Sequence, residues 1–134
     1  MAKHENIQLT SAELAALHQN YLGDTMSICV FGHFLETVVD PEIKIVVEHA
    51  FDIAVQHVED IKEIFIKENI PVPIGFTEQD VNKHAPRLFS DAFYLSYIKQ
   101  WLEGAWLFMV SFSPMYSEVM FYLFILNVYS QQLS

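Results

Sequence analysis

The chain has few basic residues and a single cysteine. Its 7 lysine and arginine side chains stand against 17 aspartates and glutamates, which gives a formal net charge of −10. Phosphate backbones and anionic lipids are bound by clustered basic side chains, so the composition argues against nucleic acid as a partner. Cys29 has no second cysteine for an intrachain disulfide, which is typical of a reducing compartment.

The sequence also lacks the patterns that direct a chain to or across a membrane. Residues 1–13 contain neither the apolar core nor the small-residue cleavage site of a secretory signal. The apolar run at 119–126 is far shorter than the roughly 20 residues of a membrane helix, and Pro114 and Glu118 interrupt the sequence before it. We therefore expect no transmembrane segment and a cytoplasmic location, which includes the inside of a forming spore.

Signatures of common enzyme chemistry are missing as well. The sequence contains no glycine-rich phosphate loop, no serine nucleophile elbow and no Cys-x-x-Cys pair. Cys29 has no histidine or other base at helical spacing, so a nucleophilic role is disfavoured. These absences favour a role without catalysis.

Two long helices are predicted in the first half of the chain. Thr10 followed by Glu13 forms a capping-box signature for a helix start. Asp40 followed by Pro41 ends that helix and caps the next, which runs to about Asn69. Both segments carry an apolar stripe with helical spacing, so we expect them to form an antiparallel hairpin.

The rest of the chain predicts an extended crossing and further helices. The segment at 69–87 carries a Pro-Val-Pro sequence that opposes a helix, and Thr77 with Asp80 predicts a single helical turn within it. A third helix is predicted from near Pro86, and Ser113 with Pro114 breaks it before a fourth. The fold class is therefore all-α, with residues 1–134 forming one up-down bundle of three or four long helices. An extended crossover between helices two and three matches ferritin-like connectivity.

Asp24 and His57 are the main candidates for a site. They lie at nearly equal distances from the turn at 39–41 and on the inner stripes of their helices, so they should face each other. Such a pair can ligate a metal ion or move a proton, or it can be a buried polar pair that fixes the helix register. Asp91, on the inner stripe of the third helix, can add a carboxylate to a metal site or favour the helix N-terminus through its charge.

The standard ferritin-like di-metal site is not encoded. That site needs Glu-x-x-His on two helices, and Ala54 stands three residues before His57. We expect no cofactor, and the alternative of a metal ion bound by Asp24, His57 and Asp91 stays open.

Three segments resemble a domain family of unknown function from Bacillus-type spore formers. They are LTSAELAALHQNYLGDTMSICVFGHFLE, EHAFDIAVQHVEDIKEIFIKENIPVPIGFTEQDVN and APRLFSDAFYLSYI. The resemblance covers residues 5–100 and is most specific in the irregular connector. It implies a ferritin-like four-helix bundle, and some members are labelled putative spore-coat proteins. The family has no established catalytic residues to transfer to this chain.

The resemblance ends where charged residues become rare. Glu118 is the sole charged residue from 111 to 134, whereas the resemblance implies a polar-faced fourth helix after an Arg-Ser-Asp turn. Reading the codons one base earlier permits such a turn and helix. Two hypotheses follow for residues 104–134: an out-of-frame segment produced by a one-base shift between about codons 99 and 104, or a genuinely divergent tail.

Together these observations predict a structural or interaction protein without enzymatic activity, and the resemblance adds an association with the spore. Its expected partner is a second copy of the chain or a protein component of a coat. The alternative is a ferritin-like bundle that binds a metal or has redox activity.

Overall fold

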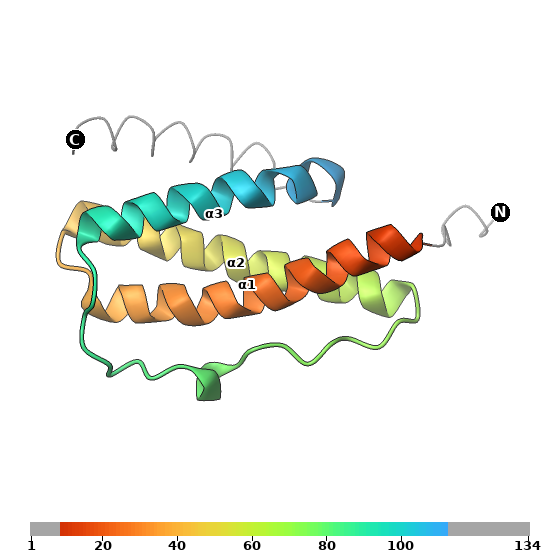
Figure 1. Ribbon diagram of the computed structural model, residues 1–134, viewed down its shortest axis with the longest axis horizontal. Coiled ribbons are helices and arrows are strands. Elements are labelled where there is room, and N and C mark those ends of the chain that lie inside the picture. The colour runs from red at the N-terminus through yellow and green to blue at the C-terminus, as the bar shows by residue number, and fades with distance from the viewer. Residues whose placement is uncertain (1–8, 113–134) are drawn as a thin grey trace.

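The computed structural model describes the backbone of residues 9–112 and the side chains of residues 9–104. The elements of this part are the α-helices α1 (Ser11–Thr37), α2 (Pro41–Lys67) and α3 (Asp91–Phe112), and the short 3-10 helix η2 (Glu78–Asp80). Within these residues the fold is all-helical and contains no strand, as the sequence predicts. Figure 1 shows α1 and α2 as an antiparallel hairpin, with α3 parallel to α2.

Both predicted caps of the hairpin are present. Thr10 Oγ1 accepts a hydrogen bond from the Glu13 backbone N–H at 3.1 Å, and Glu13 Oε1 accepts one from the Thr10 N–H at 2.9 Å. Asp40 Oδ1 accepts from the backbone N–H groups of Glu42 and Ile43, with Pro41 as the first residue of α2. Because these caps satisfy backbone N–H groups that the helices leave free, the starts of α1 and α2 follow directly from the sequence.

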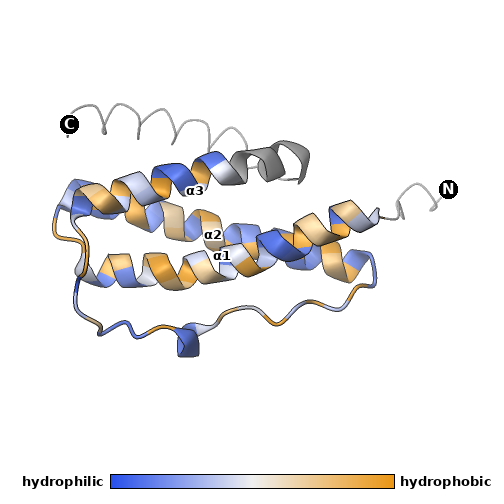
Figure 2. Cartoon of the chain, viewed as in Figure 1, coloured by the Kyte–Doolittle hydropathy of each residue, from blue (hydrophilic) through white to orange (hydrophobic). Residues whose placement is uncertain are grey.

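The connector between α2 and α3 runs along the length of the bundle against α1. Figure 1 shows it returning from the end of α2 to the start of α3, so the crossover that the sequence predicts is present. Thr25 Oγ1 accepts from the Phe76 N–H at 3.1 Å, Cys29 Sγ donates to the Thr77 carbonyl at 3.3 Å, and His33 Nε2 donates to the Ala85 carbonyl at 2.9 Å. Figure 2 shows hydrophobic residues recurring along the connector, while η2 is hydrophilic.

The third helix starts later than the sequence predicts. It begins at Asp91 and not near Pro86, with Ser90 as the capping residue: Ser90 Oγ accepts from the Phe93 N–H at 3.2 Å. Arg87 donates to the carbonyl oxygens of Phe89 and Thr37 at 2.6 and 3.0 Å. These bonds hold the segment before Ser90 in a non-helical conformation, so the proposed start near Pro86 is wrong.

Helical spacing in the sequence predicts one inner stripe for the third helix, made of Leu88, Leu95, Ile98 and Leu102, and one of these residues lies elsewhere. Leu88 precedes the helix and is 78% exposed. Leu95, Ile98 and Leu102 are buried as predicted. The error follows from the helix boundary, because a residue outside the helix does not share its face.

The apolar core consists of two clusters. The larger one lies toward the hairpin turn and contains Phe31, Phe34, Ile43, Val46, Val47, Ala50, Ile53, Ala54, Tyr94, Leu95, Ile98 and Leu102. The smaller one lies toward the start of α1 and contains Leu17, Tyr21, Val58, Ile61 and Phe65. In both α1 and α2 the boundary between the clusters is a polar residue, Asp24 in one helix and His57 in the other.

Several predictions concern residues outside the described part. The break at Ser113 and Pro114, the fourth helix and most of the segment at 104–134 lie there. Within the described part, no helix combines the length and the apolar character needed to span a membrane.

Candidate functional site

Asp24 and His57 form a buried polar pair. His57 Nδ1 lies 3.0 Å from Asp24 Oδ2, and the exposed fractions of the two side chains are 0% and 6%. A carboxylate accepts and an N–H donates, so the imidazole donates its Nδ1 hydrogen to the Asp24 carboxylate. The two residues that the hairpin register predicts to face each other are therefore in direct contact.

Two further polar residues of α1 are buried beside Asp24. The Thr25 hydroxyl donates to the Leu22 carbonyl and the Ser27 hydroxyl donates to the Gly23 carbonyl, both at 2.9 Å. Both hydroxyls thus donate to the preceding turn of their own helix, and the Thr25 hydroxyl also accepts from the Phe76 N–H of the connector. The middle of α1 therefore buries polar side chains at positions where the helices of a protein core usually carry apolar ones.

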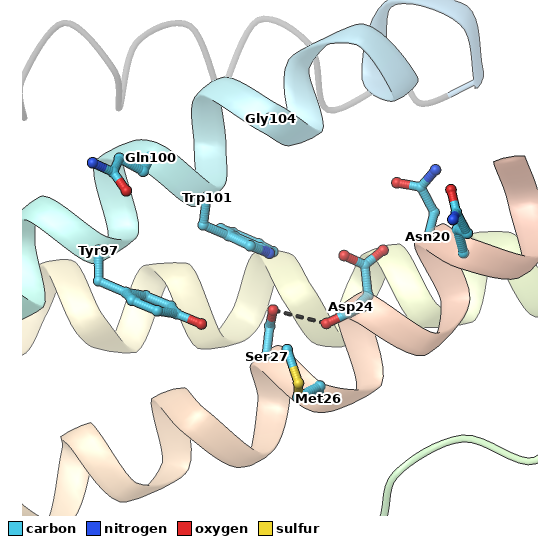
Figure 3. Close-up of a pocket in the computed structure, with 10 residues that line it drawn as sticks. Asn20, Asp24, Met26, Ser27, Tyr97, Gln100, Trp101 and Gly104 are labelled. Carbon is cyan, nitrogen blue, oxygen red and sulfur yellow. Dashed lines mark hydrogen bonds between the residues drawn. The ribbon is translucent and has the colours of Figure 1, made fainter.

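A hollow of about 350 Å³ lies between α1 and α3 next to the pair. Asn20, Gly23, Asp24 and Ser27 line it from α1. From α3 it is lined by Tyr97, Gln100, Trp101 and Gly104. Figure 3 shows the Asp24 carboxylate and the Trp101 indole approaching the hollow from opposite helices. Asp24 therefore contacts His57 inside the core and also borders a space between the helices.

Asp91 lies at the other end of the described bundle. Its carboxylate accepts from the backbone N–H groups of Val39 and Asp40, at 3.3 and 2.8 Å, and from Arg87 at 2.6 Å. Burial opposes its negative charge, but these donors outweigh burial and lower the pKa of Asp91. Asp24 lies more than three helical turns from that end of α1, roughly 20 Å along the axis.

The structure thus brings Asp24 and His57 together and places Asp91 in a different contact, where it joins the start of α3 to the hairpin turn. Among the residues whose side chains are described, no group of three or more His, Cys, Asp or Glu side chains is arranged to hold a metal ion. Ala54, at the position of the missing glutamate, is fully buried in apolar surroundings.

The chemistry open to the pair is limited by access. A carboxylate that holds one imidazole N–H orients the ring, as in metal-bound histidines and in the bases of hydrolases. His57, however, has no exposed surface, so a dissolved substrate does not reach the imidazole in this conformation. The accessible member of the pair is Asp24, through the hollow.

The surroundings of Cys29 disfavour the reactive thiolate form. Its thiol donates to the Thr77 carbonyl, and burial, followed by the negative charge of Asp80, raises the pKa of the thiol. A raised pKa lowers the thiolate fraction that reacts. This agrees with the absence of a base near Cys29 in the sequence.

The hollow itself was not predicted from the sequence. Its aromatic wall comes from a helix that is distant in the chain, so local patterns do not reveal it. One signal was available: Asn20, Asp24 and Ser27 follow each other at spacings of four and three residues, which places polar groups on one face of α1.

Comparisons with known proteins give a family and no characterised relative. A search of curated proteins and a search of solved structures each found no match. A family model described as "Protein of unknown function (DUF3231)" matches residues 1–107. The chain therefore belongs to the DUF3231 family.

Proposed function

We propose that this protein is a ferritin-like helical bundle that acts by protein association, without catalysis, in the cytoplasm or in the spore. The observation that carries this proposal is an exposed apolar surface around the start of α3, which we call the end patch. It consists of Val39, Leu88, Phe89 and Phe93, which are 76%, 78%, 48% and 39% exposed. Large apolar side chains gathered on a surface are typical of association sites.

The end patch is held in a defined shape. The rings of Phe89 and Phe93 stack with their centroids 4.2 Å apart. Asp91, between them in the chain, bonds to Arg87 and to the backbone of Val39. A surface that is already ordered loses less conformational entropy on binding, so the end patch is suited to stable contact.

The partner that we propose is a second copy of the chain. Apolar side chains pack favourably on other apolar side chains, so the end patch of one copy can pack on the end patch of another. A two-fold symmetric interface requires such a self-complementary surface. Two copies that each carry a net charge of −10 repel each other over most of their surface. Association through an uncharged patch avoids close approach of like charges, and added salt should strengthen it by screening the remaining repulsion.

The ferritin-like assignment rests on connectivity. A hairpin followed by one long crossover to a helix parallel to the second is seen in α1, α2, the connector and α3 (Figure 1). Ferritin-like bundles use one such long crossover.

The test is the molar mass of the purified chain as a function of concentration and salt, measured by light scattering coupled to size-exclusion chromatography. The Phe89→Ser and Phe93→Ser variants should weaken self-association by about tenfold or more each, since aromatic side chains dominate such interfaces. Ile74→Ser, at a connector residue that is 95% exposed, is the control and should leave the mass unchanged. A wild-type chain that stays monomeric at about 100 μM, or variants with unchanged mass, would overturn the proposal.

The contact between Asp24 and His57 supports a second candidate, a metal-binding or redox bundle that uses Asp24 and His57. The expected third ligand, Asp91, lies in a separate contact at the hairpin turn and does not join this site. Elemental analysis of the purified protein separates the two candidates. Metal at one equivalent per chain that is lost in His57→Ala and retained in His84→Ala would favour the second candidate, since His84 is an exposed connector residue. Metal content that is negligible or equal in both variants would support the first.

A further inference from the structure

The hollow between α1 and α3 has a wall of oxygen acceptors. Asn20 Nδ2 donates to the Ala16 carbonyl at 2.8 Å, and the Ser27 hydroxyl donates its hydrogen to the Gly23 carbonyl at 2.9 Å. Asp24, as a carboxylate, has acceptors only. These bonds leave the Asn20 amide oxygen, the Ser27 lone pairs and the Asp24 carboxylate as acceptors on the α1 side, which the Gln19 amide also lines. This wall is therefore suited to a hydrogen-bond donor.

The opposite wall is aromatic and held in place. The Tyr97 and Trp101 rings both contact Phe31 edge to face, with centroids 6.1 and 5.0 Å apart and interplanar angles of 87° and 85°. Figure 3 shows Trp101 across the hollow from Asp24 and Ser27. An aromatic face opposite a carboxylate favours a cation between them, because the ring quadrupole and the negative charge attract the same ligand.

The hollow also has two glycines on its lining. A Cβ atom added at Gly23 or at Gly104 would have no described atom within 4 Å, apart from the adjacent backbone. Glycine inside a helix costs about 0.5–1 kcal/mol relative to alanine, and packing among the described residues requires it at neither position. Two such residues facing one space, one from each helix, enlarge that space.

We propose that this hollow binds a small primary amine in its ammonium form. An –NH₃⁺ group has three hydrogens to donate and no acceptor, which matches the oxygens of Asn20, Asp24 and Ser27. The carbon part of the ligand packs on Trp101 and Tyr97. A volume of about 350 Å³ falls within the range of ligand pockets and admits a molecule of about ten heavy atoms.

The buried position of Asp24 strengthens the charge recognition. The Asp24 side chain is 6% exposed and its Oδ2 atom holds the His57 N–H, so the carboxylate is fixed in orientation and poorly solvated. Hydrogen bonds between charged groups are stronger than neutral ones, and more so away from water. A neutral ligand of the same shape should therefore bind much more weakly.

The test uses 2-phenylethylamine, which is protonated at pH 7, and 2-phenylethanol, a neutral molecule of nearly the same shape. Each is titrated into the full isotope-labelled chain, and binding is followed by NMR shifts of the Trp101 indole N–H and of the Asp24 and Ser27 amides. We expect the amine to shift these signals with a dissociation constant in the millimolar range or below. The alcohol should bind at least about tenfold more weakly.

Three variants locate the site. Asp24→Asn removes the charge and should weaken amine binding by about tenfold or more, whereas Asp52→Asn, at an exposed residue of α2, should not change it. Gly23→Leu fills the hollow while keeping Asp24 and His57, so it tests the site even if Asp24→Asn fails to fold, and it should abolish binding. Equal affinities for amine and alcohol, shifts that cluster elsewhere, unchanged binding by folded Asp24→Asn or Gly23→Leu, or no binding by the wild type would each overturn the proposal.

Discussion

The contact between Asp24 and His57 predicts strong energetic coupling between the two residues. Replacing one member by leucine leaves the other in the core without its hydrogen-bond partner. Breaking a buried ion pair in this way costs about 3–5 kcal/mol, whereas replacing both members with apolar residues is often nearly neutral. We expect Asp24→Leu and His57→Leu each to lower the free energy of unfolding by about 3 kcal/mol, and the double variant by no more than about 3 kcal/mol in total.

The coupling energy is therefore at least about 3 kcal/mol in magnitude, which is at the upper end of values for contacting residues. Urea unfolding followed by circular dichroism at four points of the cycle measures it directly. In thermal unfolding, a chain of 134 residues has an unfolding entropy of roughly 0.3 kcal/mol/K, so each single variant should melt about 10 °C below the wild type.

The control is a pair of opposite charges on the surface. Lys62 and Glu59 lie 3.4 Å apart and both are exposed, so Lys62→Met should change the unfolding free energy by less than about 1 kcal/mol. If the Asp24 and His57 variants are additive to within about 0.5 kcal/mol, the two side chains do not depend on each other, and the assignment of the pair as a structural contact fails.

The remaining predictions concern the connector and the start of α3. Gly75→Ala should cost about 1–3 kcal/mol in urea unfolding, because its Cβ would lie 2.8 Å from Thr25 Oγ1, while Gly23→Ala should be neutral or stabilising; equal effects would contradict the close packing of the connector. Ser90→Ala should cost about 1 kcal/mol through loss of the α3 cap, and no loss would move the helix start. The lowered pKa of Asp91 stabilises the fold above the unfolded-state pKa of about 3.9, and this stability is lost as the pH falls through the folded pKa. Asp91→Asn should thus be less stable than the wild type at pH 7 and similar at pH 2, and a constant difference between the two would refute the pKa assignment.

Much of the fold was predictable because its boundaries are encoded by short-range chemistry. The caps at Thr10, Asp40 and Thr77 each need only residues two or three positions away, and all three are present. The start of α3 was not predictable in the same way, since Pro86 and Ser90 are both acceptable start signals. What decides between them is a long-range bond from Arg87 to the Thr37 carbonyl.

The buried residues are also predictable in part from spacing along the chain and in part only from contacts between distant segments. The apolar stripe that helical spacing predicts on α1 correctly includes Leu17, Tyr21 and Phe31, but it wrongly includes Leu14, which is 37% exposed. A single stripe also does not account for Phe34. Phe34 is buried because Tyr94 of α3 stacks on it with centroids 4.0 Å apart. The candidate pair was predictable from hairpin register, whereas the hollow depends on how α3 lies against α1 and required the structure.

The position of the polar pair explains how a largely apolar bundle selects one alignment of its first two helices. Apolar contacts are non-directional, so a hairpin whose seam is lined by aliphatic side chains gains similar burial in alignments that differ by two helical turns. Any such shift would separate Asp24 from His57 and leave two polar groups in the core, at a cost of several kcal/mol. The connector adds a second constraint, because its bonds to Thr25, Cys29 and His33 form only when α1 has the observed position along the bundle. We therefore expect the polar groups at one level of the core and along one side of α1 to select the alignment, while the apolar clusters on either side contribute burial without direction.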